Sequence, residues 1–227
     1  MRFCKAAALD SNPVNPVNPV NVHRLLLATR NSHKTREFAQ ILGEGFSVHD
    51  LSEAARLSVV EETGLTFEAN AILKAVEASE HFDELIVADD SGLEVDALAG
   101  APGIYSARYA GVHATGAANI AKLFAELARC DPGPHSARFR CALALAQRGK
   151  VLGTFEGTVE GTIVNPPRGS AGFGYDPVFQ PRGFDQTFGE LPAAEKNRIS
   201  HRARAIRLLR AALGSPGLIE PGRLRAS

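Results

Sequence analysis

Short apolar runs alternate along this chain with segments whose apolar residues recur every three or four positions. The runs at 25–28, 46–51 and 85–88 are typical of buried strands. Segments 65–78, 117–128 and 200–213, and a shorter one that stops at Gly43, place apolar side chains on one helical face, with Thr66 and Ser200 suited to N-caps. Residues 138–146 and 151–164 are strand-like on either side of a hairpin turn at 147–150. This interleaving predicts an α/β fold built on a mixed sheet.

Composition limits the class of protein. The 227 residues, 44% of them hydrophobic, suit one globular unit. Lys+Arg and Asp+Glu both number 25, and a net charge of zero disfavours a protein that grips long nucleic acid through its phosphates. The longest apolar runs fall short of a membrane span or a signal-peptide core, and the three cysteines lack zinc-site spacing. We therefore expect a cytoplasmic protein that binds neither membrane nor nucleic acid.

The two ends of the chain differ from its middle. Pro-Val-Asn recurs three times within residues 11–21, and proline at every third position forbids a helix. The segment after Gly214 is rich in proline and glycine. We expect a disordered leader at 1–22, one domain at 23–213 and a flexible tail at 214–227.

A polar loop, Thr29-Arg30-Asn31-Ser32-His33-Lys34, stands between the first predicted strand and the first predicted helix. Backbone N–H groups at a helix N-terminus suit a phosphate, and Lys34 adds a cation. The glycine patterns of a Walker loop or a dinucleotide-binding turn are missing from the sequence. The loop is thus either a phosphate site or an ordinary capped helix start with a surface lysine.

Two acidic motifs are candidates for a metal site. Glu61 and Glu62 precede the predicted helix at 65–78, and Asp89-Asp90-Ser91-Gly92 follows the apolar run at 85–88. Each has an ordinary explanation, because acids favour a helix N-terminus and Asp-Ser-Gly favours a turn. Together, carboxylates from separate elements suit Mg²⁺, which takes one or two of them plus phosphate oxygens and water.

Two further stretches combine glycine, aromatic and basic residues. Residues 169–177 read Gly-Ser-Ala-Gly-Phe-Gly-Tyr-Asp-Pro, so Phe173 or Tyr175 could either stack on a flat ligand or pack into the core. Six Lys or Arg residues and no acid lie between Lys196 and Arg210. Such a run is usually a solvated helix face, but cations in the first turn of a helix oppose its dipole and often indicate an anionic partner.

Taken jointly, these motifs resemble the noncanonical purine NTP pyrophosphatase family, the inosine/xanthosine triphosphatases or Ham1-like proteins. The resemblance spans residues 25–213 and rests on five blocks: LLLATRNSHKTREF, EETGLTFEANAILKA, ADDSGLEVDALAGAPGIYSARYAG, GFGYDPVF and EKNRISHRARA. It implies an elongated mixed sheet with flanking helices and two lobes around a central nucleotide cleft, usually in a homodimer. The implied reaction converts ITP, dITP or XTP and water to the monophosphate and pyrophosphate.

The resemblance also implies roles for individual residues. Asp90 would accept a proton from water and, with Glu61, bind Mg²⁺. The other implied contacts are to the substrate. The triphosphate would be held by Thr29, Arg30, Asn31, Ser32, His33 and Lys34. Ser91 would touch the substrate, the base pocket would be formed by Phe173, Gly174, Tyr175 and Asp176, and the site would be completed by Lys196, His201 and Arg202. The sequence departs from one common form of the family at Arg30, where glycine often stands, and at Glu68-Ala69, where a glutamate often directly precedes Asn70. Two alternatives are a Maf-like pyrophosphatase acting on other modified nucleotides and a nucleotide-binding module without turnover.

Overall fold

The computed structural model describes residues 23–53 and 60–214, which form a mixed sheet between two helical layers. The strand order is β2-β1-β3-β4-β5-β6, with β1 parallel to β2 and β3 and every later pairing antiparallel. This confirms the predicted α/β class with a mixed sheet. The strands are β1 (His23–Leu27), β2 (Phe46–Asp50), β3 (Leu85–Val95), β4 (His135–Gln147), β5 (Lys150–Ile163) and β6 (Phe179–Pro181).

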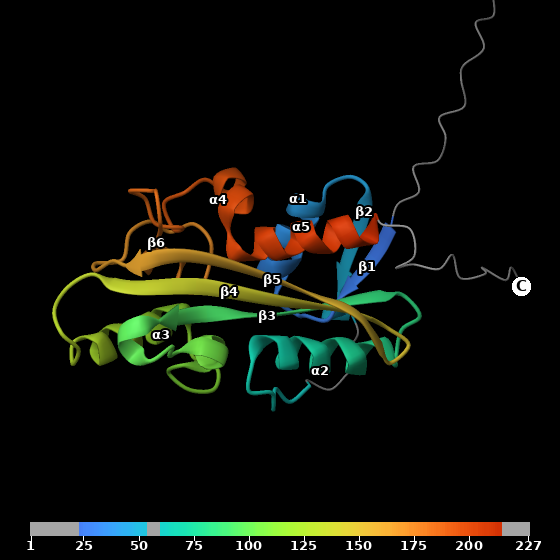
Figure 1. The fold of residues 1–227 in the computed structure, drawn as a ribbon, viewed down its shortest axis with the longest axis horizontal. Helices are drawn as coiled ribbons and strands as arrows, with labels where there is room; N and C mark the ends of the chain where they lie inside the picture. Colours follow the sequence, from blue (N-terminus) through green and yellow to red (C-terminus); the bar gives the residue numbers. More distant parts are fainter. Residues whose placement is uncertain (1–22, 54–59, 215–227) are drawn as a thin grey trace, which may run out of the picture.

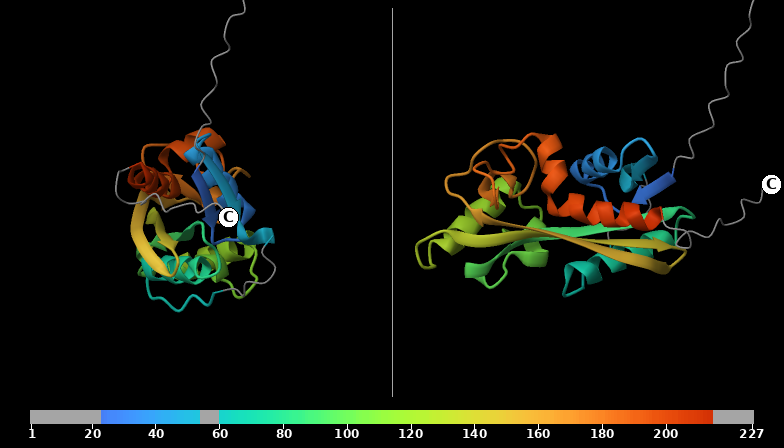
Figure 2. Two further views of the ribbon diagram at one scale, coloured as in Figure 1. Left: turned by 90° about the vertical axis from the view of Figure 1, so that its right-hand side faces the viewer. Right: turned by 45° about the horizontal axis from the view of Figure 1, so that its top comes forward.

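Helices cover both faces of the sheet. Figure 1 shows α1, α4 and α5 above the long β3–β4–β5 ribbon and α2 and α3 below it, and Figure 2 shows the same layering from two other directions. No helix of the described residues is both long and apolar enough to span a membrane. The helices are α1 (Ser32–Leu42), α2 (Phe67–Ser79), α3 (Gly116–Leu127), α4 (Ala193–Ile199) and α5 (His201–Leu213), with 3₁₀ turns at Leu51–Glu53, Asp96–Leu98, Gly103–Arg108 and Asp176–Val178.

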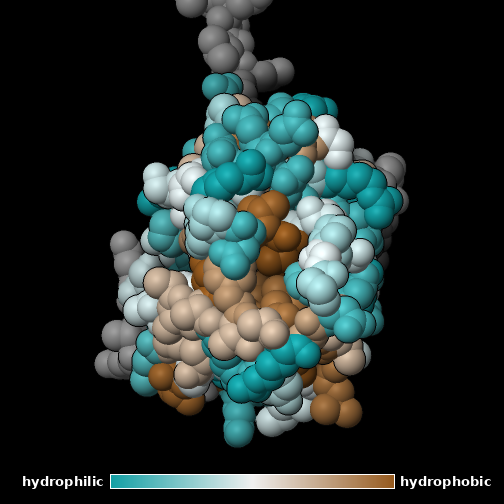
Figure 3. Space-filling view, turned by 90° about the vertical axis from the view of Figure 1, so that its left-hand side faces the viewer, coloured by the Kyte–Doolittle hydropathy of each residue, from teal (hydrophilic) through white to brown (hydrophobic). Residues whose placement is uncertain are grey.

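The polar centre of β3 lies between two apolar clusters. Val87 belongs to the cluster under α1 and α5, whereas Leu93 and Val95 belong to the cluster at the other end of the ribbon. A third, alanine-rich layer joins α2 to the sheet. The end face away from both termini of the described chain is hollowed and apolar at its centre (Figure 3). Residues 89–91 therefore fall where the two large clusters leave room for polar side chains.

The structure decides between local alternatives and changes some details. Of the two explanations for Asp89-Asp90-Ser91-Gly92, the turn is excluded, because β3 continues through the segment to Val95. Gly92 lets the strand pass close under the 103–108 turn, since a Cβ there would lie 2.4 Å from the Gly103 carbonyl oxygen. The segment 65–78 was predicted to bury its larger apolar side chains on one face, but the buried face of α2 is built from Phe67, Asn70 and small residues, and Ile72 and Val76 are only half-buried.

Other differences concern boundaries. Helix α1 begins at Ser32, inside the predicted loop, and neither α4 nor β6 was predicted as a separate element. The predicted helix at 200–213 is confirmed as α5, with Ser200 as its N-cap and Ala203, Ile206, Leu209 and Leu213 buried. The predicted leader and all but the first residue of the predicted tail lie outside the described residues.

Candidate active site

Asp89 and Asp90 are adjacent in β3, so their side chains point to opposite faces of the sheet. Both are nearly buried, with side-chain exposures of 3% and 9%. Burying a carboxylate is costly unless a cation or hydrogen-bond donor lies beside it. Distant elements provide those partners, and they are different for the two residues.

Asp89 is held by two cations above the sheet. Arg202, from the first turn of α5, donates from Nε to Asp89 Oδ2 at 2.7 Å, and Lys34 of α1 pairs with the other carboxylate oxygen. Burial raises the pKa of Asp89, but the charges of Arg202 and Lys34 outweigh it and hold the pKa well below its usual value. Asp89 therefore stays ionised and positions both cations.

Asp90 lies below the sheet beside Lys74 of α2. Lys74 Nζ is 2.8 Å from Asp90 Oδ1 and 3.1 Å from Glu62 Oε1, and Asn70 donates to Asp90 Oδ2 at 3.3 Å. Burial raises the pKa of Asp90, and Lys74 only partly offsets this. A carboxylate with a raised pKa is a better proton acceptor than an ordinary one. Asp90 thus has the properties that a general base requires.

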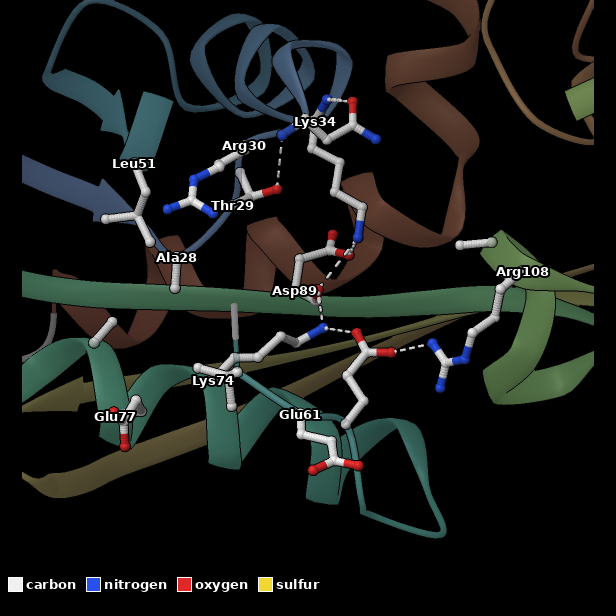
Figure 4. A pocket seen from close by; sticks show the side chains of 15 residues that line it. Ala28, Thr29, Arg30, Lys34, Leu51, Glu61, Lys74, Glu77, Asp89 and Arg108 are labelled. Carbon is white, nitrogen blue, oxygen red and sulfur yellow. Dashed lines mark hydrogen bonds and ion pairs between the residues drawn. The ribbon is translucent and has the colours of Figure 1, made fainter. Parts of the chain in front are cut away.

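The acidic loop presents Glu62, rather than Glu61, to this cluster. Glu62 bridges Lys74 and Arg108, whereas the exposed Glu61 lines the same cavity with its carboxylate turned away from Lys74 and Asp89 (Figure 4). The metal role predicted for Glu61 stays a prediction. Glu68, the residue at the departure from the common pattern, lies outside the cluster and accepts a hydrogen bond from Thr154 at 2.7 Å.

The donor set suits a hard divalent cation. The carboxylates of Asp90 in β3 and Glu62 in the loop before α2 both pair with the Lys74 ammonium group, so they lie close to each other. No cluster of three or more His, Cys, Asp or Glu side chains in the described ranges has metal-site geometry. Two carboxylates are sufficient for Mg²⁺, because substrate phosphates and water complete its coordination.

The predicted phosphate loop is the capped start of α1. The Asn31 side chain accepts hydrogen bonds from the backbone N–H groups of His33 and Lys34, and Thr29 Oγ1 accepts one from Asn31 N. A cavity of about 600 Å³ opens beside this loop, lined by Thr29, Arg30, Asn31 and Lys34. Ser32 is exposed on the first turn, and His33 faces a second cavity instead.

The second cavity, about 400 Å³, is lined by the glycine-rich loop and the basic helices. Phe173 is half-buried at its wall, while Tyr175 is buried and donates from its hydroxyl to the Ser106 carbonyl oxygen at 3.0 Å. Gly174 has a φ of +62°, a conformation that favours glycine. Besides Phe173, Gly174 and Tyr175, the predicted site residues that line this cavity are Asp90, Ser91, Asp176, Lys196, His201 and Arg202.

His201 and Lys196 determine the chemistry of this wall. The His201 ring is buried, and its Nδ1 has no hydrogen-bond partner among the residues that the structure describes. Burial and the nearby Arg202 charge hold the pKa of His201 well below its usual value. His201 is therefore a neutral ring with an unused polar atom. Lys196 Nζ lies 2.6 Å from Asp176 and 2.8 Å from Glu37.

Three functional candidates were missed in the sequence. Glu37 bridges Lys196 and Arg202, Lys74 joins Asp90 to Glu62, and Arg108 holds Glu62. The spacing of two of them could have indicated this. Glu37 is three residues from Lys34 on one helix and Lys74 is four residues from Asn70 on another, so each shares a helix face with that residue.

The two cavities adjoin each other. Lys34, Glu62 and Lys74 line both of them, so the larger and smaller spaces share a charged boundary. A ligand that is polyanionic at one end and flat at the other matches this arrangement.

Comparison with known proteins identifies the family. A model of the Ham1 family matches residues 25–212, almost the whole described part of the chain. The chain belongs to the Ham1 family. The predicted resemblance is thereby confirmed.

Relatives of this Ham1-family chain are similar over nearly their full length. A dITP/XTP pyrophosphatase of Bacillus licheniformis is 49% identical over 190 residues, which cover 83% of this chain and 97% of that protein. The dITP/XTP pyrophosphatase of Bacillus subtilis is 48% identical over 185 residues, covering 81% and 93%.

Solved structures support the same fold. A HAM1 protein from Coxiella burnetii superposes with a TM-score of 0.76 at 39% identity, covering 85% of this chain and 98% of that one. The Ham1 protein of Staphylococcus aureus gives a TM-score of 0.73 at 41% identity, covering 84% and 97%.

Proposed function

We propose that this Ham1-family enzyme hydrolyses noncanonical purine nucleoside triphosphates (ITP, dITP and XTP) to the monophosphate and pyrophosphate, and so cleanses the nucleotide pool. The Bacillus relatives are named dITP/XTP pyrophosphatases, which supports dITP and XTP as substrates of this chain. The observation that carries the proposal on this chain is the junction of the two cavities at Lys34, Glu62 and Lys74. A nucleoside triphosphate spans such a junction, with its base in the smaller cavity and its phosphates at the larger one.

Asp90 is the proposed catalytic residue. Attack of water on the innermost phosphorus requires a proton acceptor, and Asp90 combines a raised pKa with a place on the wall of the smaller cavity, paired with Lys74 of the junction. Lys34, Lys74 and Arg108 are positioned to neutralise charge on the phosphates and on the departing pyrophosphate. Thr29, Arg30, Asn31 and Ser32 would contribute the remaining contacts of the phosphate loop.

Mg²⁺ is the proposed cofactor, held by Asp90 and one carboxylate of the Glu61–Glu62 pair. When bound, it would supply Lewis acidity and lower the pKa of a bound water. The resemblance favours Glu61, and the contacts of the described residues favour Glu62. Glu61→Gln and Glu62→Gln separate the two, because the variant that removes the ligand needs more Mg²⁺ for half-maximal activity. An unchanged requirement in both variants would remove this loop from the metal site.

Selection of the base is assigned to the wall formed by Phe173, Tyr175, Lys196, His201 and Arg202. A polar atom that pairs with a 6-keto purine is left unsatisfied by a different base edge, and such losses produce strong discrimination. The Nδ1 of His201, which has no hydrogen-bond partner within 23–53 and 60–214, is one such atom. Arg202→Lys should reduce the preference for ITP over ATP, whose base has a 6-amino group in place of the 6-keto group, and an unchanged ratio of kcat/KM values would exclude Arg202 from selection.

A substrate panel tests the activity itself. ITP, dITP, XTP, GTP and ATP are each incubated with Mg²⁺ or with EDTA, and the nucleoside monophosphate formed is quantified directly by ion-exchange chromatography. We expect turnover of the first three with Mg²⁺, loss with EDTA, and loss in Asp90→Asn. Preference for other modified nucleotides would favour the Maf-like alternative, and binding without turnover would favour a non-catalytic module.

Assembly and location are further parts of this proposal. We propose a cytoplasmic homodimer, which interacts with a nucleotide substrate rather than with a membrane or nucleic acid. Light scattering tests the dimer, and a mass equal to one chain would refute it. Filter binding to RNA at moderate salt tests whether the protein binds nucleic acid, and we expect no retention of RNA.

A further inference from the structure

His33 and Phe173 form an aromatic pair between two loops that are far apart in sequence. Their rings are stacked, with centroids 5.3 Å apart and an interplanar angle of 25°. His33 belongs to the first turn of α1, whereas Phe173 belongs to the glycine-rich loop. The pair therefore connects the proposed phosphate loop to the proposed base pocket.

The backbone around Phe173 leaves its ring dependent on such contacts. Gly172 and Gly174 on either side have φ values of +75° and +62°, and neither has a side chain that could pack against the ring. The backbone N–H of Phe173 donates to Asp176 Oδ2 at 2.8 Å, which fixes the main chain but not the ring. His33 is its aromatic ring partner among the described residues.

The ring of Phe173 also lies beside the cations of the base pocket. Lys196 Nζ is 5.0 Å from the ring centroid and the Arg202 guanidinium carbon is 5.5 Å from it. A displacement of the ring would therefore change the surroundings of both cations as well as the stacking surface. The residue that holds the Phe173 ring in place therefore affects the affinity of the pocket for a flat base.

The location of His33 separates it from its neighbours in the loop. Thr29 and Arg30 line the larger cavity, where the triphosphate is proposed to lie, whereas His33 lines the smaller one together with Phe173. Its backbone N–H is already bonded to the Asn31 side chain at 3.0 Å. These contacts assign His33 to the base side of the cleft rather than to the phosphates.

We propose that His33 is a positioning residue for base binding, which holds the Phe173 ring against the purine. The proposal rests on the proposed function, and it replaces the triphosphate contact that the family resemblance implied for this residue. Removal of His33 weakens the ground-state binding of a nucleotide that has a base. It leaves the chemical step and the binding of bare phosphate chains unchanged.

The test compares His33→Ala with His33→Phe, which keeps a ring to stack, and with Arg36→Ala as a control at an exposed site of the same helix. KM and kcat are measured with ITP, and inorganic tripolyphosphate serves as a competitive inhibitor without a base. An aromatic pair of typical strength predicts a rise of about 2- to 12-fold in KM for His33→Ala. We expect unchanged kcat, an unchanged inhibition constant for tripolyphosphate, and parental KM in His33→Phe and Arg36→Ala.

A second comparison uses the Phe173→Leu background, in which the stacked pair is already lost. There His33→Ala should cause no further rise in KM. An unchanged KM in the single variant, or an equal loss of tripolyphosphate binding, would overturn the proposal. If the parent chain does not hydrolyse ITP, the proposed function fails separately, because calorimetric Kd values for ITP and tripolyphosphate still decide the role of His33.

Discussion

Replacement of Arg202 by methionine should strongly destabilise this protein. Arg202 is 2% exposed and contacts three side chains from two other elements: Asp89 at 2.7 Å, Ser91 at 2.8 Å, and Glu37. Methionine fills a similar volume but leaves two nearly buried carboxylates without this partner. The change therefore tests whether the ion pairs above the sheet are required for folding.

The expected loss follows from what remains after the substitution. Breaking a buried ion pair by removing one partner typically costs about 3–5 kcal/mol. Asp89 keeps Lys34 and Glu37 keeps Lys196 at 2.8 Å, so we expect the lower half of that range. For a domain of this size, about 3–4 kcal/mol corresponds to a fall in Tm of roughly 6–16 °C.

The pH dependence of the loss identifies its cause. Burial raises the pKa of Glu37, but the charges of Arg202 and Lys196 outweigh it and hold the pKa below its usual value. A carboxyl with a lowered folded-state pKa stabilises the protein above its unfolded pKa, and this stability is lost as the pH falls through the folded pKa. The difference between parent and variant should thus be largest near pH 7 and should shrink below about pH 4.

The assay is urea unfolding followed by circular dichroism, in EDTA and without nucleotide, at pH 7 and at about pH 3, which lies below the range where the difference begins to shrink. Arg198→Met is the matched control, because Arg198 is exposed and pairs only with Glu195 of its own helix in the described structure. A parental free energy of unfolding for Arg202→Met at pH 7, or a loss of equal size at both pH values, would refute the reasoning.

Three further changes test the site and its supports. Asp90→Asn should lower kcat by about 10²–10⁴-fold while ITP still binds in calorimetry; near-parental turnover would exclude Asp90 as the base. Gly64→Ala should lower kcat/KM, because the new Cβ would lie 2.6 Å from Asn70 Oδ1 and displace the acidic loop; Gly45→Ala, with open space around it, is the control. Ser200→Ala removes the cap bond from Ala203 N and should cost about 1 kcal/mol, or a Tm fall of roughly 2–4 °C, in a thermal melt.

The helices of this protein were largely predictable from sequence, because their signals are local. Thr66 and Ser200 accept hydrogen bonds from the third residue of their helices, as their N-cap positions suggest. The interleaved pattern likewise indicated the mixed sheet. The separate helix α4 was missed because it is only seven residues long and Pro192 at its start offers no side-chain cap.

The centre of β3 was not predictable in the same way. An Asp-Asp-Ser-Gly sequence favours a turn locally, and it is held in a strand by partners that lie far away in the chain. Lys34 and Arg202 neutralise Asp89 from 55 and 113 residues away. The choice of Glu62 over Glu61 in the contacts of Lys74 also depends on tertiary structure, since the two are adjacent and chemically identical.

The ionic pairing of the cleft has a kinetic consequence. Four cations lie at its centre, and each has a carboxylate neighbour: Lys34, Lys74, Lys196 and Arg202. Little uncompensated positive potential therefore extends into solvent. Polyanions are then not drawn in from a distance, and their capture rate should change only modestly with ionic strength. Recognition must take place after arrival, when phosphate oxygens exchange places with aspartate and glutamate around the same ammonium and guanidinium groups.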